Sequence, residues 1–207
     1  LSSPEKRDLV SHIYEDANWL LHMVENLLSV TRIADGGASV LKKTPEAAEE
    51  VLFDAVSTSR KRYPDLQIKT VIPDEFVTAP MDPLLIKQVL LNLIENAYFH
   101  ARSTKPLECT LSSTEDAIKF CIRDYGSGIA PDRLSGIFDA VPSAPSSAAS
   151  TVDTRKGMGI GLSICKAIVN AHNGEITARN LTEGAEFCFT IPKEEIHHET
   201  NDPNPRH

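Results

Sequence analysis

Apolar residues recur at helical spacing through residues 84–102 and predict a helix that is buried on most of its surface. Four polar side chains nevertheless lie four residues apart and share one face of it, namely Gln88, Asn92, Asn96 and His100. A buried amide without a partner costs about 1–3 kcal/mol. Two interpretations of the stripe are possible. It is either a hydrogen-bonded seam between helices, or one wall of a binding site. Amide oxygens are suitable partners for a hydrated Mg²⁺ ion, so the ligand of such a site could include this metal.

The first part of the chain carries a different helical pattern. Apolar positions in alternating steps of four and three run through residues 4–33 and predict a long helix with a coiled-coil seam, which Asp35 and two glycines end. Such a seam must be covered by another helix or by a second copy of the chain. We expect residues 1–35 to form a separate helical unit, residues 36–195 the main domain, and the polar residues 196–207 a disordered tail.

Alternating patterns and capping residues predict the remaining elements. Strands are expected at 38–43, 66–72, 76–79, 107–112, 117–124, 175–179 and 185–191, and helices at 44–61, 131–138 and 162–172. Thr44 as the cap and Pro45 at the first helical position predict a helix start at 44. Asp82 and Pro83 play the same two roles for the central helix.

A glycine turn follows one of these strands. Asp124 ends the strand, and Gly126 and Gly128 allow positive φ angles and a close approach of a ligand to the backbone. A carboxylate at this place can accept a hydrogen bond from an exocyclic amine such as that of adenine. The same pattern also occurs in ordinary hairpin turns, so that alternative stays open.

A second group of glycines, Gly157, Gly159 and Gly161, opens the helix at 162–172. Backbone N–H groups at a helix N-terminus favour phosphate. These glycines do not follow a core strand, as a dinucleotide-binding turn requires, and the motifs of P-loop proteins and of eukaryotic-type kinases do not occur. The preceding residues 141–157 are rich in Ser, Ala and Pro, which predicts a mobile lid within one domain; the alternative is a linker between domains.

Composition excludes several other functions. A net charge of −8, with no basic cluster beyond residues 60–62, argues against binding of nucleic acid. The four cysteines form no Cys-x-x-Cys pair, which argues against zinc and thioredoxin-type chemistry. Cys121, Cys165 and Cys188 lie on apolar patterns and are expected to be core thiols in a reducing compartment. No run approaches the about 18 apolar residues of a membrane span, so we expect a soluble, cytoplasmic chain.

The amide-striped helix, the Asp–Gly–Gly turn and the glycine-opened helix occur in an order that resembles the ATP-binding domain shared by sensor histidine kinases and by the gyrase, Hsp90 and MutL ATPases. Asn92 and Asn96 match the N box of that family, and Phe138 matches its F box. The two glycine groups match its two glycine boxes. The resemblance covers about residues 38–192 and implies an α+β fold, a two-layer α/β sandwich of the Bergerat type, preceded by a long dimerisation-type helix.

Within the family the chain looks like a histidine kinase. Asn92 stands where the ATPases carry a glutamate base, and an amide cannot take a proton from water. The adjacent acid, Glu95, lies about 100° around the helix from Asn96 and so points in another direction. Residues 23–33 and 157–174 look most like the Kdp-type sensor kinases, which regulate potassium transport in bacteria. Two alternatives stay open: a nucleotide-responsive binding module without transfer activity, and a gyrase- or Hsp90-type ATPase.

The resemblance also implies the roles of individual residues. Asn96 would ligate Mg²⁺, Asn92 would bond to phosphate, Asp124 would bind the adenine amine and His100 would lie beside the adenine. Arg155 or Lys156 would neutralise phosphate charge. The residues expected at the ATP site are Asn92, Asn96, His100, Asp124, Gly126, Gly128, Arg155, Lys156, Gly157, Gly159, Gly161 and Leu162.

Three departures from the family qualify this picture. Phe99 stands where many relatives carry a lysine, and Ala185 replaces a usual Ser or Thr. The motif of the phosphoacceptor histidine is absent, because neither His12 nor His22 continues it. The first helix instead resembles the second helix of the dimerisation hairpin.

We therefore expect a chain that binds ATP or ADP with Mg²⁺ but does not phosphorylate itself. Its parent would dimerise through the first helix, transfer the γ-phosphoryl group to a histidine and pass it to a response regulator. That parent would be an inner-membrane receptor, anchored through N-terminal regions absent from this sequence.

Overall fold

The computed structural model describes residues 41–101, 103, 105–139 and 160–194, together with residues 6, 9, 10, 13, 17 and 24. The six single positions are helical and exposed, and they include Ile13 and Val24 of the predicted seam, which are 58% and 53% exposed. The remainder of the predicted first helix, the predicted lid at 141–157 and the predicted tail lie outside the described residues.

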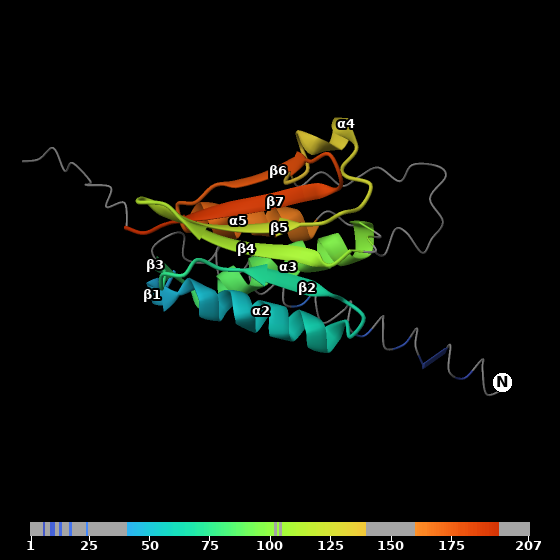
Figure 1. The fold of residues 1–207 in the computed structure, drawn as a ribbon, viewed down its shortest axis with the longest axis horizontal. Helices are drawn as coiled ribbons and strands as arrows, with labels where there is room; N and C mark the ends of the chain where they lie inside the picture. Colours follow the sequence, from blue (N-terminus) through green and yellow to red (C-terminus); the bar gives the residue numbers. More distant parts are fainter. Residues whose placement is uncertain are drawn as a thin grey trace, which may run out of the picture.

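A five-stranded sheet forms one layer of the main domain (Figure 1). Its strands are, in spatial order, β2 (Ile68–Val71), β4 (Leu107–Ser113), β5 (Ala117–Arg123), β7 (Ala185–Pro192) and β6 (Ile176–Asn180). β2 and β4 are parallel, and the other neighbours are antiparallel. A separate antiparallel pair consists of β1 (Thr44–Ala47) and β3 (Thr78–Met81).

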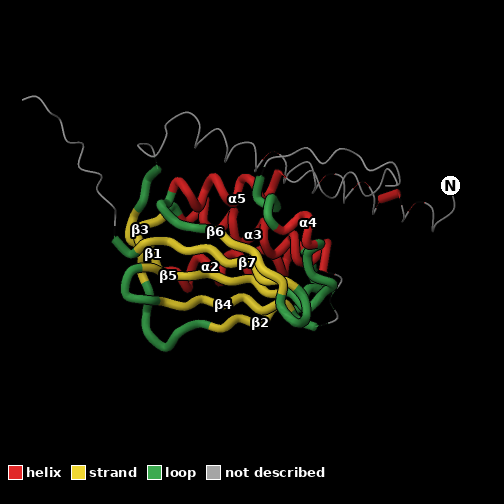
Figure 2. Tube along the Cα trace, turned by 90° about the horizontal axis from the view of Figure 1, so that it is seen from above, coloured by secondary structure: helices red, strands yellow, loops and turns green. Residues whose placement is uncertain are grey.

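Helices cover one face of this sheet (Figure 2). α3 (Pro83–Ala101) and α5 (Ile160–Ala171) pack on each other, and α2 (Ala48–Arg62) packs beside α3. The short helix α4 (Pro131–Leu134) follows β5. The α+β sandwich expected from the sequence is therefore confirmed.

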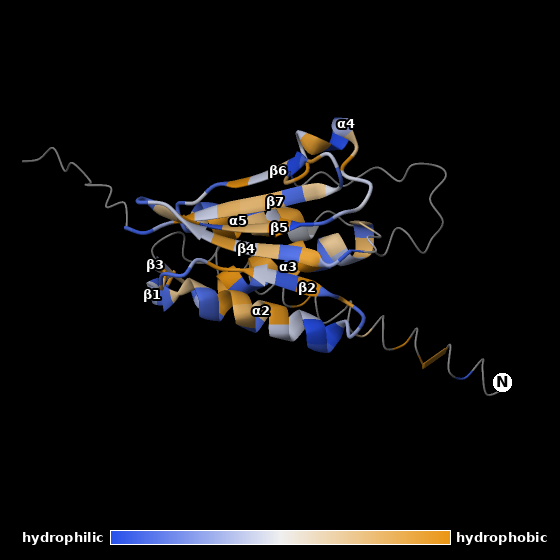
Figure 3. Cartoon of the chain, in the orientation of Figure 1, coloured by the Kyte–Doolittle hydropathy of each residue, from blue (hydrophilic) through white to orange (hydrophobic). Residues whose placement is uncertain are grey.

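Apolar residues alternate with polar ones along the central strands, and the apolar side chains form the core between the sheet and the helices. Phe120 of β5 and Phe189 of β7 are fully buried and stack with their ring centroids 4.9 Å apart. Burying one such side chain contributes about 1.5–3 kcal/mol. Hydrophobic colouring runs along β4, β5 and β7, whereas the C-terminal end of α2 is hydrophilic (Figure 3). The central helix thus lies against an apolar sheet face, and a polar stripe on it requires specific partners.

The start of α3 agrees with its prediction. The Oδ1 atom of Asp82 accepts hydrogen bonds from the backbone N–H groups of Leu84 (3.0 Å) and Leu85 (3.2 Å), so it caps the helix. Pro83 occupies the first helical position, where its missing N–H group is harmless.

The predicted start of the second helix was wrong. Thr44 and Pro45 belong to β1, and α2 begins at Ala48. The reason is tertiary, since β3 supplies a strand partner for residues 44–47. The Val77 carbonyl then accepts the Ala48 N–H (2.9 Å), and the Glu49 carboxylate accepts the Val77 N–H (2.8 Å), which replaces the expected cap.

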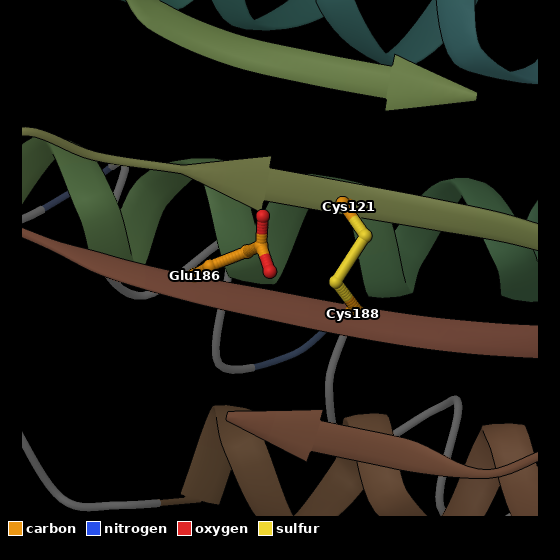
Figure 4. Close-up of side chains that lie close together, drawn as sticks. All are labelled: Cys121, Glu186 and Cys188. Atoms are coloured by element: carbon orange, nitrogen blue, oxygen red, sulfur yellow. A yellow bond between two sulfur atoms is a disulfide. The ribbon is translucent and has the colours of Figure 1, made fainter. Parts of the chain in front are cut away.

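The prediction of three core thiols was wrong for two of them. Cys121 and Cys188 lie directly opposite each other on β5 and β7 and form a disulfide (Figure 4). The sequence pattern could not contain this register, which depends on pairing between strands 67 residues apart. Cys109 and Cys165 are buried free thiols, and burial raises the pKa of each to about 12.

Candidate functional site

The inner half of the polar stripe on α3 is a hydrogen-bonded seam. Gln88 and Asn92 are buried, and Nε2 of Gln88 donates to Oδ1 of Asn92 at 3.1 Å. Nδ2 of Asn92 then donates to the Gly161 carbonyl at 3.3 Å, in the first turn of α5. Of the two alternatives for the stripe, the helix–helix seam holds at this end.

The outer half of the stripe opens to the surface. Asn96 is partly exposed, and its side chain makes no hydrogen bond with any other described residue. His100 lies in the last turn of α3 and is exposed, so the expectation of four buried polar residues was wrong there. The stripe therefore runs from the interior to the surface, as one wall of an open site would.

Asp124 forms the first of two corners beside this stripe. It is only 5% exposed, and its Oδ1 atom accepts the backbone N–H groups of Gly126 (2.9 Å) and Ala185 (3.2 Å). No described residue donates to Oδ2. One oxygen thus fixes the carboxylate in place, while the other remains available to a ligand with an amine donor.

The glycine after Asp124 is required by packing against α3. A Cβ atom at Gly126 would lie 2.0 Å from the carbonyl oxygen of Ala101, the last residue of that helix. Gly128 has φ of +74°, and a Cβ atom there would lie 2.9 Å from Oδ1 of Asn180. The turn at 124–128 therefore packs against the end of α3 because position 126 is glycine, and it packs against Asn180 because position 128 is glycine.

Two supporting residues were missed in the sequence. Gly184 has φ of +80°, and a Cβ atom there would lie 2.1 Å from the Asp124 carbonyl oxygen. Asn180 holds the end of the turn, since it accepts from the Ile129 N–H (2.8 Å) and donates to the Ile129 carbonyl (2.7 Å). The only signal for Gly184 was its place immediately before the last strand; nothing in the sequence distinguished Asn180.

The second corner is described only in part. Gly161 lies beside Asn92, with a hypothetical Cβ atom 3.8 Å from Cγ of that side chain. Leu162 is partly buried and packs against the core. Arg155, Lys156, Gly157 and Gly159 lie outside the described residues. The structure thus brings Asp124, Gly126, Asn92, Asn96 and Gly161 together along one helix.

Glu95 faces a different part of the molecule. Its Oε1 atom accepts from Nη1 of Arg62 at 2.7 Å and from the hydroxyl of Tyr63 at 3.3 Å, both at the C-terminal end of α2. Burial, followed by the charge of Glu95, raises the pKa of the Tyr63 phenol far above its usual value. This carboxylate is therefore engaged between α2 and α3.

Phe99 and Ala185 are the two positions at which this chain departs from the usual residues of the family. Phe99 is 39% exposed and packs edge-on against Tyr63 and Tyr98, with ring centroids 5.5 Å and 5.1 Å away. Ala185 is buried and bonds to Asp124 through its backbone alone, accepting the Asp124 N–H at 3.0 Å. A hydroxyl at 185 is thus unnecessary for holding the carboxylate.

Comparison with known proteins identifies the family of this chain. Residues 81–195 match the family described as histidine kinase-, DNA gyrase B-, and HSP90-like ATPase. The chain is 39% identical over 195 residues to the sensor protein KdpD of Clostridium acetobutylicum, covering 94% of this chain and 21% of that protein. It is 33% identical over 195 residues to the sensor protein KdpD of Escherichia coli, covering 93% and 21%.

A solved structure agrees with these relatives. Full-length ShkA in complex with AMPPNP superposes with a TM-score of 0.68 at 26% identity, over 93% of this chain and 39% of that one. The chain therefore belongs to the histidine kinase-, gyrase- and HSP90-like ATPase family. The similarity to the two KdpD proteins agrees with the Kdp-type resemblance of its motifs.

The match leaves part of the relatives uncovered. The chain spans 21% of the length of each of the two KdpD proteins. Among the residues that the structure describes, no helix is both long and apolar enough to cross a membrane.

Proposed function

We propose that this chain is the ATP-binding catalytic portion of a sensor histidine kinase, which donates the γ-phosphoryl group of Mg·ATP to a histidine for relay to a response regulator. The observation that supports it most is the convergence on α3. The Asp124 turn packs on the surface end of the amide stripe and Gly161 packs beside its buried part. The structure of ShkA in complex with AMPPNP supports a nucleotide as the ligand.

The described side chains fit such a ligand. Oδ2 of Asp124 accepts the exocyclic amine of adenine, and the amide oxygen of Asn96 is a suitable Mg²⁺ ligand. Asn92 positions the first turn of α5 and lies within reach of phosphate through the same amide. Arg155 and Lys156, which lie outside the described residues, are proposed to neutralise phosphate charge, and Gly157, Gly159 and Gly161 are proposed to shape the loop around it. The exposed ring of His100 flanks the base.

The metal, when bound, neutralises charge on the phosphate oxygens. The protein's own contribution is to position the nucleotide and exclude water, because phosphoryl transfer needs little covalent chemistry from the enzyme. Of the seven histidines in the chain, none stands in the acceptor motif. The chain therefore binds Mg·ATP without phosphorylating itself, and residues 1–35 serve as the dimerisation-type helix.

Nucleotide affinity tests this proposal directly. Titration of a fluorescent ATP analogue, with and without Mg²⁺, should show tighter binding with the metal. Asp124→Asn should weaken binding at least about tenfold, equivalent to about 1.4 kcal/mol. Asp116→Asn, a matched change at an exposed position of the β4–β5 turn, should have no effect. Equal affinity for wild type and Asp124→Asn would contradict the assigned site.

Phosphoryl transfer is tested separately. Incubation of the chain with Mg·ATP labelled at the γ-phosphate should give no acid-labile phosphoprotein. Addition of a dimerisation hairpin that carries an acceptor histidine should give label on the hairpin. A stable phosphohistidine on the chain alone would contradict the proposal, and absence of label on the hairpin would favour a binding module without transfer.

A further inference from the structure

Three metal-ligating side chains meet on the sheet and are not part of the candidate nucleotide site. Cys121 of β5 pairs directly with Cys188 of β7, with their Cα atoms 4.1 Å apart. Glu186 precedes Cys188 by two positions and shares its face of β7. The two sulfur atoms and a carboxylate oxygen all lie within 4.8 Å of one another (Figure 4).

This group lies on the face of the sheet that the helices do not cover. The neighbouring residues Phe120 and Phe187 point into the core, so strand alternation turns Cys121, Glu186 and Cys188 the other way. In Figure 2, α3 and α5 lie on the opposite face. Cys121 and Glu186 are partly exposed, which leaves two of the three donors accessible to a small solute, and the third donor, Cys188, is 5% exposed.

The carboxylate is oriented by its surroundings. A row of alternating charges crosses all five strands in register: Lys69, Glu108, Arg123, Glu186 and Arg179. Arg179 donates from Nε (2.6 Å) and Nη2 (2.5 Å) to the same atom, Oε2 of Glu186. No described residue donates to Oε1. A carboxylate held by one oxygen with the other left available is the arrangement that orients a metal ligand.

We propose that Cys121, Cys188 and Glu186 bind one Zn²⁺ ion when the two cysteines are reduced, and that the disulfide is the metal-free form of the same site. Two thiolates and one carboxylate are a ligand set suited to zinc, and a water molecule completes the tetrahedron. Once reduction breaks the disulfide, the two sulfur atoms can move apart to accept zinc–sulfur bonds of about 2.3 Å, with a zinc–oxygen bond of about 2.0–2.2 Å to Glu186.

The two forms interconvert with a small thiol. Two molecules of a low-molecular-weight thiol give two electrons and two protons to the Cys121–Cys188 bond, which becomes two thiols while the reductant becomes its own disulfide. Zn²⁺ binding then releases the two thiol protons to solvent. The absence of a Cys-x-x-Cys pair concealed this site in the sequence, because its ligands come from two strands.

Metal titration of the intact chain tests the proposal. The chain is reduced with a phosphine under anaerobic conditions, desalted, and titrated with Co²⁺ and with Zn²⁺ against a chromophoric chelator. We expect one ion per chain and a thiolate-to-cobalt absorption band. Cys121→Ser and Cys188→Ser should each weaken Zn²⁺ binding at least about 100-fold, and Glu186→Gln about tenfold.

Matched controls separate this site from general effects. Cys109→Ala, at a buried thiol, and Glu108→Gln, in the same charge row, should bind Zn²⁺ as the wild type does. The oxidised chain should bind none. Glu186→Gln keeps both thiols, so it remains informative if a cysteine variant fails to fold.

Failure to bind Zn²⁺ after reduction, or undiminished binding by Cys188→Ser, would overturn the proposal. Nucleotide affinity measured on the same samples reports independently on the ATP site, because the proposed zinc site does not depend on the proposed kinase function.

Discussion

The backbone N–H of Asp82 donates a hydrogen bond to Nε2 of His172 at 3.0 Å. The other ring nitrogen, Nδ1, lies 2.8 Å from the Ile168 carbonyl and donates to it. The two bonds require a neutral imidazole, since a protonated ring has no acceptor. His172 therefore ties the N-terminus of α3 to the C-terminus of α5, the two helices whose contact positions the candidate ATP site.

This contact predicts a specific pH dependence of stability. Burial lowers the pKa of His172 below its ordinary value of 6.5. The unfolded chain then binds the proton more readily than the folded one. The contribution of the neutral His172 to the free energy of unfolding is complete above about pH 6.5. It is lost as the pH falls towards the lowered pKa that His172 has in the folded state. Urea unfolding at pH 7.5 and 5.5 should show the loss.

The matched variants isolate this histidine from other titrating groups. His172→Gln keeps an acceptor but does not titrate, so its free energy of unfolding should decline less than that of the wild type between pH 7.5 and 5.5. His100→Gln, at an exposed position, should follow the wild type. Parallel declines for wild type and His172→Gln would refute the assignment.

The close approach of Gly126 to α3 predicts the effect of adding one methyl group. Gly126→Ala places a Cβ atom against the Ala101 carbonyl, so either the turn or the helix end must move. We expect a loss of about 1–3 kcal/mol in stability and weaker binding of nucleotide. Gly136→Ala is the control, because the nearest atom to its Cβ is a side-chain oxygen 3.6 Å away. Equal thermal stability and affinity in the two variants would disprove the packing role.

Replacing Asn92 and replacing Asn96 should have different effects on stability and on nucleotide binding. Asn92→Ala removes the hydrogen bond from Gln88 and the hydrogen bond to Gly161, both of them inside the contact between α3 and α5. It should lower stability by about 1–3 kcal/mol and weaken nucleotide binding. Asn96→Ala removes no hydrogen bond between described residues, so its melting temperature should not change. It should abolish only the gain in affinity that Mg²⁺ gives, and an unchanged gain would contradict the proposed metal ligand.

The sequence sufficed where local chemistry decides the structure. Asp82 and Pro83 define a helix start by themselves, and the prediction there was confirmed. Thr44 and Pro45 carry the same local signal, yet pairing with β3 overrides it. The disulfide between Cys121 and Cys188 depends on register between distant strands, and register follows from the whole sheet.

The candidate site shows the same difference between local and long-range determinants. Asp124 and the glycines could be selected as candidates from the sequence because their chemistry is local to one turn. The contact between Asn92 and Gly161 and the partners of Glu95 were not, because helix packing sets them.

Glu95 provides a test between kinase and hydrolase. A hydrolytic ATPase would use a carboxylate near the nucleotide as a base, and its loss would abolish release of inorganic phosphate. In this structure Glu95 pairs instead with Arg62 and Tyr63. Glu95→Gln should therefore leave nucleotide affinity unchanged and lower stability by about 1–3 kcal/mol, because Arg62 loses its buried counter-charge. Chemical unfolding and nucleotide titration on one preparation check both parts. Steady phosphate release by the wild type that disappears in Glu95→Gln would instead favour the hydrolase, because it would show that Glu95 acts on the attacking water and not only in the α2–α3 contact.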